Sequence, residues 1–240
     1  MSRIYAHRGF SGKYPENTML AFEKAIEAGA EGIEFDVHLI KDDSLVIIHD
    51  ETLDRTTDGT GLVKDYTFDE LQKFDASASF VGQYGANRIP KLRDYFELVK
   101  DIPDFKTNIE LKTSVFEYRP IEEMVIAMIE EYKLQDSIIL SSFNHYTIMR
   151  CKQINPEIQA GFLSGDWIYN FGAYTKQYGV ECCHPCFRSL TQEVVDEMKA
   201  NNRIINTWTV NEYDDIRRLA DMGIDGLIGN FPDRMVELLR

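Results

Sequence analysis

Short apolar runs alternate with amphipathic stretches along this 240-residue chain, and this alternation constrains the fold more than any other feature. The runs are rich in β-branched residues, and helical patterns follow or separate most of them. Such alternation predicts a parallel sheet with helices between its strands. We expect eight strands, at residues 3–6, 32–37 with 45–49 (one bent strand or a strand pair), 107–111, 137–140, 158–163, 179–183, 203–207 and 225–228.

Helical patterns cover residues 18–28, 121–132, 191–199 and 211–222, and the last begins with Asn211 as an N-cap type of residue. Eight strand-and-helix units in a chain of this length favour a closed barrel over an open doubly wound sheet. The first strand is not followed by the Gly-x-Gly-x-x-Gly turn of dinucleotide-binding sheets, which disfavours the open sheet further. The predicted fold is therefore an α/β TIM barrel.

One segment, residues 51–88, interrupts the alternation because it contains no good core strand. It holds the polar stretch 54–61 and a short helix that begins with a capping box from Thr67 to Glu70. Long loops in compact domains are usually functional. We interpret the segment as a small insertion after the second strand, over the mouth of the barrel, and residues 1–240 as one domain.

The net charge of −14 disfavours some classes of partner. Nucleic acid requires a basic footprint on the protein, so we expect no nucleic-acid partner. Anionic membrane surfaces are disfavoured for the same reason. No stretch is apolar enough for a signal peptide or a membrane span, so we expect a cytoplasmic protein without stable membrane association.

Four cysteines fit this compartment as free thiols. Three of them lie close together within residues 182–186, a spacing that superficially suggests zinc. Adjacent cysteines do not easily share one tetrahedral ion, and no second Cys/His pair follows at zinc-finger spacing. We favour a buried strand that ends at His184-Pro185.

Carboxylates stand near the ends of two predicted strands. Glu34 and Asp36 are two residues apart, so both point to one side of their strand, and Glu110 and Lys112 follow the same rule on another strand. In a barrel, inward positions at the C-terminal ends of strands converge on one small volume. Three carboxylates there would repel one another unless a cation neutralised them, and oxygen ligands suit Mg²⁺ or Ca²⁺ better than Zn²⁺. The pattern predicts a site for one divalent cation.

Two histidines and two cationic side chains complete the predicted site. His7 and Arg8 follow the first apolar run, and His49 ends a later one. Two imidazoles can serve both ends of a displacement at phosphorus, one as base and one as acid. A divalent ion, three carboxylates, Arg8 and Lys112 together leave one positive charge, which a phosphodiester cancels. This local balance explains how a strongly acidic chain can bind an anion.

At these residues the chain resembles the glycerophosphodiester phosphodiesterase family. The resemblance covers nearly the whole chain and shows no departure at the site positions. It is carried by residues 6–9 (Ala-His-Arg-Gly), 15–18 (Pro-Glu-Asn-Thr), 34–37 (Glu-Phe-Asp-Val), 49–61, 109–112 (Ile-Glu-Leu-Lys), 208–211 (Trp-Thr-Val-Asn) and 225–228 (Asp-Gly-Leu-Ile).

The resemblance implies a TIM barrel with a small subdomain after the second strand. It implies a metal-dependent hydrolase that cuts glycerophosphodiesters, such as glycerophosphocholine or glycerophosphoethanolamine, to sn-glycerol 3-phosphate and an alcohol. We expect His7 to be the base and His49 the acid, with either water or the glycerol 2-hydroxyl attacking first. By resemblance, the metal ligands are Glu34, Asp36 and Glu110, the acid–base pair is His7 and His49, and the phosphate contacts are Arg8 and Lys112.

Other positions are predicted from their place on the strands and helices. Trp208 could pack against the glycerol carbons or in the core, beside a mouth lined by Phe143. Thr18 is expected to cap the first helix, and Asn17 to cap it or to form a hydrogen bond near His7.

Three other functions stay open at this point. The same chemistry could act on a lysophospholipid or sphingolipid, as in phospholipase D-like enzymes, with Phe80, Tyr84 and Tyr95 as an apolar approach surface. A non-catalytic barrel that binds a phosphate ligand is disfavoured because both histidines are present. A sugar-phosphate isomerase that abstracts a proton would not need the second histidine.

Overall fold

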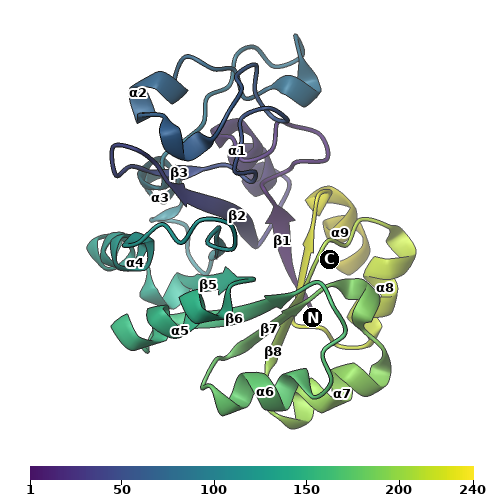
Figure 1. The fold of residues 1–240 in the computed structure, drawn as a ribbon. Coiled ribbons are helices and arrows are strands. Elements are labelled where there is room, and N and C mark those ends of the chain that lie inside the picture. The colour runs from purple at the N-terminus through teal and green to yellow at the C-terminus, as the bar shows by residue number, and fades with distance from the viewer.

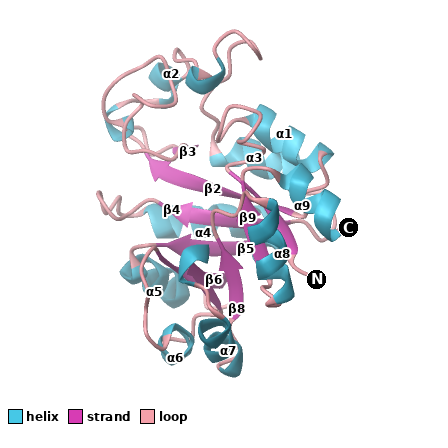
Figure 2. Cartoon of the chain, turned by 90° about the vertical axis from the view of Figure 1, so that its right-hand side faces the viewer, coloured by secondary structure: helices cyan, strands magenta, loops and turns pink.

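The structure is a computed structural model that describes residues 1–240, apart from the side chain of Ser79. The described backbone forms a nine-stranded sheet with helices around it (Figures 1 and 2). The strands are β1 (Arg3–His7), β2 (Gly32–Leu39), β3 (Leu45–Ile47), β4 (Lys106–Leu111), β5 (Ile138–Ser142), β6 (Gln159–Ser164), β7 (Cys182–Pro185), β8 (Ile204–Thr207) and β9 (Gly226–Gly229). The helices are α1 (Met19–Glu27), α2 (Phe68–Leu71), α3 (Leu92–Val99), α4 (Ile121–Tyr132), α5 (His145–Ile154), α6 (Phe171–Gln177), α7 (Gln192–Ala200), α8 (Tyr213–Asp221) and α9 (Pro232–Leu239).

Eight of these strands close into a parallel barrel. The strand order is β1-β9-β8-β7-β6-β5-β4-β2, and β2 pairs with β1 to close the ring. This is a TIM barrel, so the predicted fold class is confirmed. The remaining strand, β3, pairs antiparallel with β2. The two runs within residues 32–49 are therefore a strand pair, and β3 stands outside the barrel.

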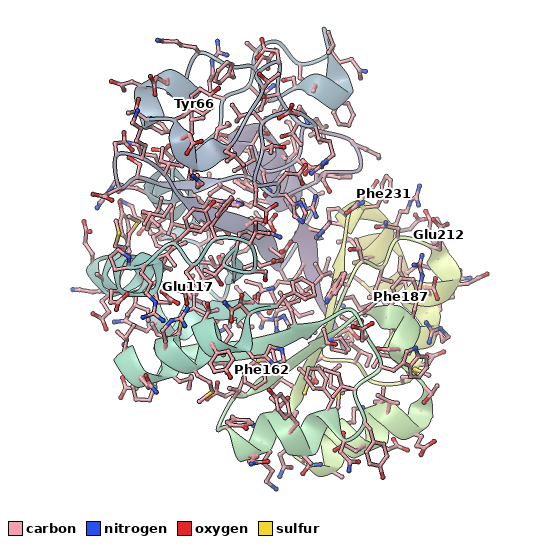
Figure 3. All side chains as sticks on the ribbon, viewed as in Figure 1. Tyr66, Glu117, Phe162, Phe187, Glu212 and Phe231 are labelled. Carbon is pink, nitrogen blue, oxygen red and sulfur yellow. The ribbon has the colours of Figure 1, made fainter. Side chains whose placement is uncertain are left out.

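The residues of β2 show how the barrel separates packing from chemistry. All eight are buried, as expected for a strand covered on both faces. Phe35 points outward and packs against Tyr95 of α3 at 4.5 Å between ring centroids. Its neighbours Glu34 and Asp36 point the opposite way, into the barrel mouth. Phe162 of β6, labelled in Figure 3, lies in the same outer layer and contacts Tyr174 of α6.

Strand β3 separates the barrel from residues 51–88. Leu45 and Ile47 belong to the main core, whereas Val46 belongs to a second cluster formed with buried residues of the 51–88 segment. The apolar run is continuous because both faces of the strand are covered. The segment contains α2 and two 3₁₀ helices, Val63–Asp65 and Ala78–Phe80. It lies at one end of the molecule beside β3 (Figures 1 and 2).

Two local predictions were wrong. The strand expected at 179–183 begins later, at Cys182, because residues 178 and 179 form the turn after α6, and it ends at Pro185, as the interpretation of the cysteine cluster predicted. Asn211 does not cap α8, whose N-cap is Glu212. Asn211 Oδ1 instead accepts a hydrogen bond from the backbone N–H of Asn230 at 2.8 Å, which fixes the end of β9.

Within the described residues, no helix has the length and apolar character needed to cross a membrane.

Candidate active site

The strand register brings the predicted site residues to one end of the barrel. His7 lies opposite Glu34 in the pairing of β1 with β2, and Asp36 lies opposite Glu110 in the pairing of β2 with β4. These three strands are parallel, so their C-terminal ends share one edge. The side chains of all four residues therefore meet at the barrel mouth, where TIM barrels carry their active sites.

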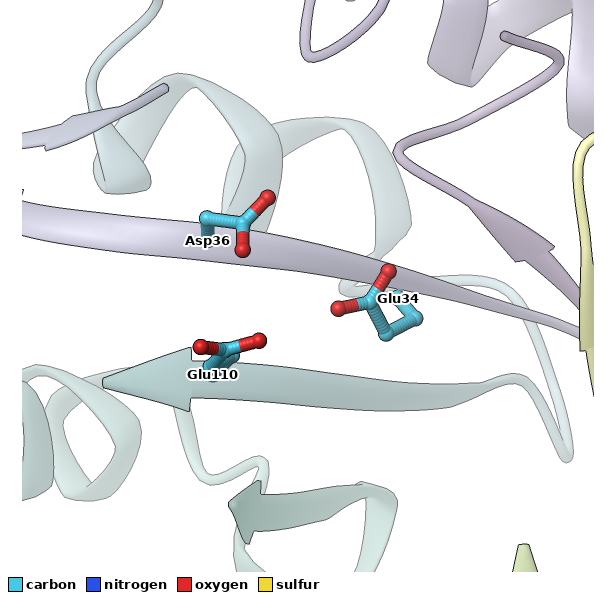
Figure 4. Close-up of side chains that lie close together, drawn as sticks. All are labelled: Glu34, Asp36 and Glu110. Carbon is cyan, nitrogen blue, oxygen red and sulfur yellow. The ribbon is translucent and has the colours of Figure 1, made fainter. Parts of the chain in front are cut away.

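Glu34, Asp36 and Glu110 form one buried cluster (Figure 4). Each offers an oxygen, and these oxygens lie within 4.8 Å of one another. Burial, followed by repulsion from Asp36, raises the pKa of Glu34 well above its ordinary value and that of Glu110 to about 7. Burial also acts on Asp36, but Arg8, His49 and Lys112 lower the pKa of that carboxyl to about 2.

The donor set of this cluster fits a hard divalent cation. Three carboxylates at this spacing repel one another, which disfavours the state in which all are ionised. Asp36 Oδ1 is buried and has no hydrogen-bond partner in the structure, so it has a free acceptor position. Carboxylate oxygens are the ligands that Mg²⁺ and Ca²⁺ prefer. Glu34, Asp36 and Glu110 could therefore hold a metal ion.

Two cationic side chains border the cluster. Lys112 Nζ lies 2.9 Å from Glu110 Oε1 and 3.8 Å from Asp36 Oδ1, and Arg8 Nε lies 3.5 Å from Asp36 Oδ2. Arg8 has a left-handed backbone, with φ of 54°, and its N–H donates to the carbonyl of Glu34 at 2.7 Å. Gly9 follows with φ of 75°, and a Cβ there would lie 2.7 Å from the backbone of Ala21. The turn after β1 thus requires glycine in order to direct Arg8 toward the carboxylates.

His7 is held with one nitrogen facing the cluster. Its Nε2 lies 3.8 Å from Glu34 Oε2, and its Nδ1 lies 2.6 Å from Asn230 Oδ1. Because an amide oxygen accepts, Nδ1 carries the proton and Nε2 keeps its lone pair. Burial, with the positive charge of Arg8, lowers the pKa of His7 to about 3. The ring is therefore neutral near pH 7 and can accept a proton at Nε2.

His49 approaches the cluster from the other side. Its Nδ1 lies 2.6 Å from Asp50 Oδ1, an acceptor that orients the ring. Its Nε2 lies 4.0 Å from Asp36 Oδ1 and 3.4 Å from Lys112 Nζ. The two imidazoles thus flank the carboxylates, each held by a different partner.

A cavity of about 80 Å³ opens onto these groups. Trp208 lines it together with Phe143, and their rings meet edge to face at 5.5 Å. The indole Nε1–H donates to the carbonyl of His184 at 2.9 Å, which fixes the ring at the cavity wall. Trp208 therefore lies at the mouth and not in the closed core.

Several residues that orient the site were missed or misplaced from the sequence. Asn17 does not approach His7, because its left-handed turn directs Nδ2 to Asp36 Oδ2 at 2.9 Å. The partner of His7 is Asn230, which is 223 residues away along the chain. Thr18 caps α1 as expected. The family-like stretch 15–18 was a signal for Asn17, whereas nothing near position 230 indicated a histidine partner.

For a lipid substrate we predicted an apolar approach surface of Phe80, Tyr84 and Tyr95, and this prediction is wrong for Tyr95. Tyr95 is fully buried against Phe22 and Phe35, because α3 turns this face toward β2. Tyr84 is exposed and donates a hydrogen bond to the carbonyl of Lys13.

The cysteine cluster does not resemble a metal site. Cys182 and Cys183 are free and buried, and burial raises the pKa of both thiols. Raised pKa values disfavour the thiolate that zinc requires.

The fold and the site together define a TIM-barrel protein whose mouth carries an acidic cluster that could hold a metal ion. The model of the Glycerophosphoryl diester phosphodiesterase family matches residues 7–234. A glycerophosphodiester phosphodiesterase from Bacillus altitudinis is 44% identical over 240 residues, which cover 99% of this chain and 98% of that relative.

Two solved structures share the fold. A phosphodiesterase from Oleispira antarctica, in complex with the product sn-glycerol-3-phosphate, has a TM-score of 0.86 and 27% identity over 100% of this chain and 97% of its own. A glycerophosphodiester phosphodiesterase from Thermotoga maritima has a TM-score of 0.80 and 30% identity over 99% of this chain and 98% of its own. The chain belongs to the glycerophosphoryl diester phosphodiesterase family, so the predicted family and class of enzyme are confirmed.

Proposed function

We propose that this chain hydrolyses glycerophosphodiesters to sn-glycerol 3-phosphate and an alcohol, with one divalent cation and two histidines. One observation carries the proposal: three buried carboxylates within 4.8 Å of one another are flanked by His7, His49, Arg8 and Lys112 at the barrel mouth. The names of the relatives and the product bound to the Oleispira antarctica enzyme support the choice of substrate.

The proposed cation is Mg²⁺ or Ca²⁺, with Glu34, Asp36 and Glu110 as ligands. When bound, such an ion would stabilise negative charge on the phosphoryl oxygens. Arg8 and Lys112 supply fixed positive charge beside the same oxygens. Both cations are largely buried, with side chains 16% and 13% exposed, so water weakens their attraction for a phosphate less than at an open surface.

The proton transfers follow from the partners of the two histidines. An oxygen of water, or the glycerol 2-hydroxyl, attacks phosphorus while the bond from phosphorus to the alcohol oxygen breaks. His7, neutral and with its lone pair at Nε2, accepts the proton of the attacking oxygen. His49 donates a proton to the leaving oxygen, and Asp50, 2.6 Å from Nδ1, orients this ring. If the 2-hydroxyl attacks first, water opens the resulting cyclic phosphate in a second step.

Trp208 is the proposed apolar contact for the glycerol carbons, because its ring lines the cavity beside the histidines.

We also propose that residues 51–88 are a subdomain inserted into a single-domain barrel, since they share a hydrophobic cluster separate from the main core. A cytoplasmic location stays a prediction.

The test is release of sn-glycerol 3-phosphate from glycerophosphocholine and glycerophosphoethanolamine, with and without EDTA. We expect turnover by the wild type with metal and its loss after chelation, in His7→Ala and in Glu110→Ala. Full turnover after exhaustive chelation would exclude the metal mechanism. An inactive wild type with Mg²⁺ or Ca²⁺ present would exclude these diesters as substrates.

A further inference from the structure

The insertion reaches the active site through Arg55. Its guanidinium binds two carboxylates at once, Glu16 from the loop after β1 and Asp50 from the end of the β3 segment. Nη1 and Nη2 donate to Glu16 at 2.9 and 2.8 Å, and Nε and Nη2 donate to Asp50 at 2.7 and 3.0 Å. Paired contacts of this kind fix orientation as well as distance, which a lysine cannot do.

Each of these carboxylates holds one residue of the site. Glu16 Oε1 accepts from Arg8 Nη1 at 2.8 Å, and Asp50 Oδ1 is 2.6 Å from His49 Nδ1. A continuous path therefore runs from Arg8 through Glu16, Arg55 and Asp50 to His49. Its two ends are the proposed phosphate contact and the proposed acid.

We infer that Arg55 is a positioning residue that sets Arg8 and His49 at the same time, by clamping the two carboxylates that hold them. The side-chain contacts of Arg55 are with Glu16 and Asp50, so we expect its effect on Arg8 and His49 to pass through these two carboxylates. The inference rests on the proposed function for its activity readouts. It also gives the insertion a role, because residues 51–88 deliver the guanidinium to the barrel mouth.

A purely structural role for Arg55 is the alternative, in which the guanidinium only anchors the insertion. The insertion has other anchors, including the Tyr84 hydroxyl on the Lys13 carbonyl at 2.9 Å and its own apolar cluster. An anchor would affect stability alone. A positioning residue would affect turnover and ligand binding in a protein that stays folded.

Arg93 provides a matched control. It also makes paired contacts to a carboxylate, Glu131, at 2.7 and 2.9 Å, and its side chain is 47% exposed, compared with 46% for Arg55. It joins α3 to α4, and with Glu131 it lines a separate surface hollow beside Leu45 and Met124. We expect Arg55→Ala and Arg93→Ala to shift the melting temperature by similar amounts, while Arg55→Ala alone lowers kcat by roughly 10–100-fold. Arg55→Lys should restore only part of this loss.

Variants of the two carboxylates can separate the effect on Arg8, through Glu16, from the effect on His49, through Asp50. Glu16→Gln should mainly weaken binding of sn-glycerol 3-phosphate and raise KM, whereas Asp50→Asn should mainly lower kcat. Adding Arg55→Ala to Asp50→Asn should change kcat by less than about 3-fold, because residues on one path are not additive. A full 10–100-fold further loss in the double variant would overturn the inference.

One readout does not need turnover. The ring nitrogen signals of His49 in NMR spectra should shift in Arg55→Ala and stay in place in Arg93→Ala. If the wild type releases no product from either diester, the proposed function fails, and the His49 signals still test the clamp. If the wild type is active and Arg55→Ala matches it in kcat, KM and the His49 signals, the clamp is refuted and the proposed function stands.

Discussion

The three buried carboxylates should make the metal-free protein less stable as pH rises, and Glu110→Gln should remove much of this effect. Glu110 is protonated in both the folded and unfolded states well below its ordinary pKa of 4.5. In the folded state its pKa is about 7. Between pH 4.5 and pH 7 the folded protein therefore keeps a proton on Glu110 that the unfolded chain releases. Folding stability therefore falls as pH rises through this window, and the full cost is present above pH 7.

Raising the pKa of Glu110 from 4.5 to about 7 lowers the free energy of unfolding by about 3 kcal/mol, at about 1.4 kcal/mol for each pKa unit. The difference in the free energy of unfolding between the wild type and Glu110→Gln isolates this cost. The variant also loses the attraction between ionised Glu110 and Lys112, but this attraction lowers the pKa of Glu110 and is therefore already included in the value of about 7. His7 is neutral in the folded state over this range and loses its proton only in the unfolded chain, which affects the wild type and Glu110→Gln alike.

The assay is urea unfolding in EDTA at pH 4.5 and pH 8, with the free energy of unfolding extrapolated to water. Between these two pH values Glu110→Gln should gain about 3 kcal/mol relative to the wild type. Glu193→Gln, on the exposed face of α7, is the control for the loss of one acidic side chain. A difference between wild type and Glu110→Gln that is the same at both pH values would refute the reasoning.

Three further outcomes are expected. Separate His7→Ala and His49→Ala variants should each lower kcat by roughly 10²–10⁴-fold with the melting temperature nearly kept, and a variant that retains wild-type kcat would lose its proposed role. Mg²⁺ or Ca²⁺ at a hundred times its dissociation constant should stabilise the wild type by about 3 kcal/mol, which calorimetry would detect as a higher melting temperature. Gly9→Ala should destabilise the fold by clearly more than about 1 kcal/mol, because its Cβ would lie 2.7 Å from the backbone of Ala21. Gly85→Ala, at φ of 71° with no atom within 4 Å of its Cβ, is the matched control, and equal urea midpoints for the two would contradict the packing argument.

The convergence of the carboxylates could be predicted because it depends on two short-range rules. The side-chain period of a strand puts Glu34 and Asp36 on one face, and parallel strands in a barrel end at one edge. Neither rule needs coordinates. The register that sets Asp36 opposite Glu110 comes from the structure and not from these rules.

Hydrogen-bond partners across long separations could not be predicted. Whether Asn17 approaches His7 or Asp36 depends on a left-handed turn at φ of 56°, which a single polar residue does not specify. Asn230 reaches His7 because β9 lies beside β1 in the closed ring. The burial of Tyr95, by contrast, follows a local pattern, because the buried residues of α3, Leu92, Tyr95, Phe96 and Val99, have the i, i+3, i+4, i+7 spacing of a core-facing helix face.

The formal charges at the site support the proposed roles of His7 as the base and His49 as the acid. A divalent ion, three carboxylates and two cations leave one positive charge, which the diester cancels. The structure adds Glu16, Arg55 and Asp50 in direct contact with the site, and these three together contribute one more negative charge. The loaded site is then negative unless one imidazole is charged. Burial and Arg8 lower the pKa of His7 and keep its ring neutral, which fits the proposed base, whereas the contact of His49 Nδ1 with Asp50 at 2.6 Å orients Nε2 toward the site, which fits the proposed donor to the leaving oxygen.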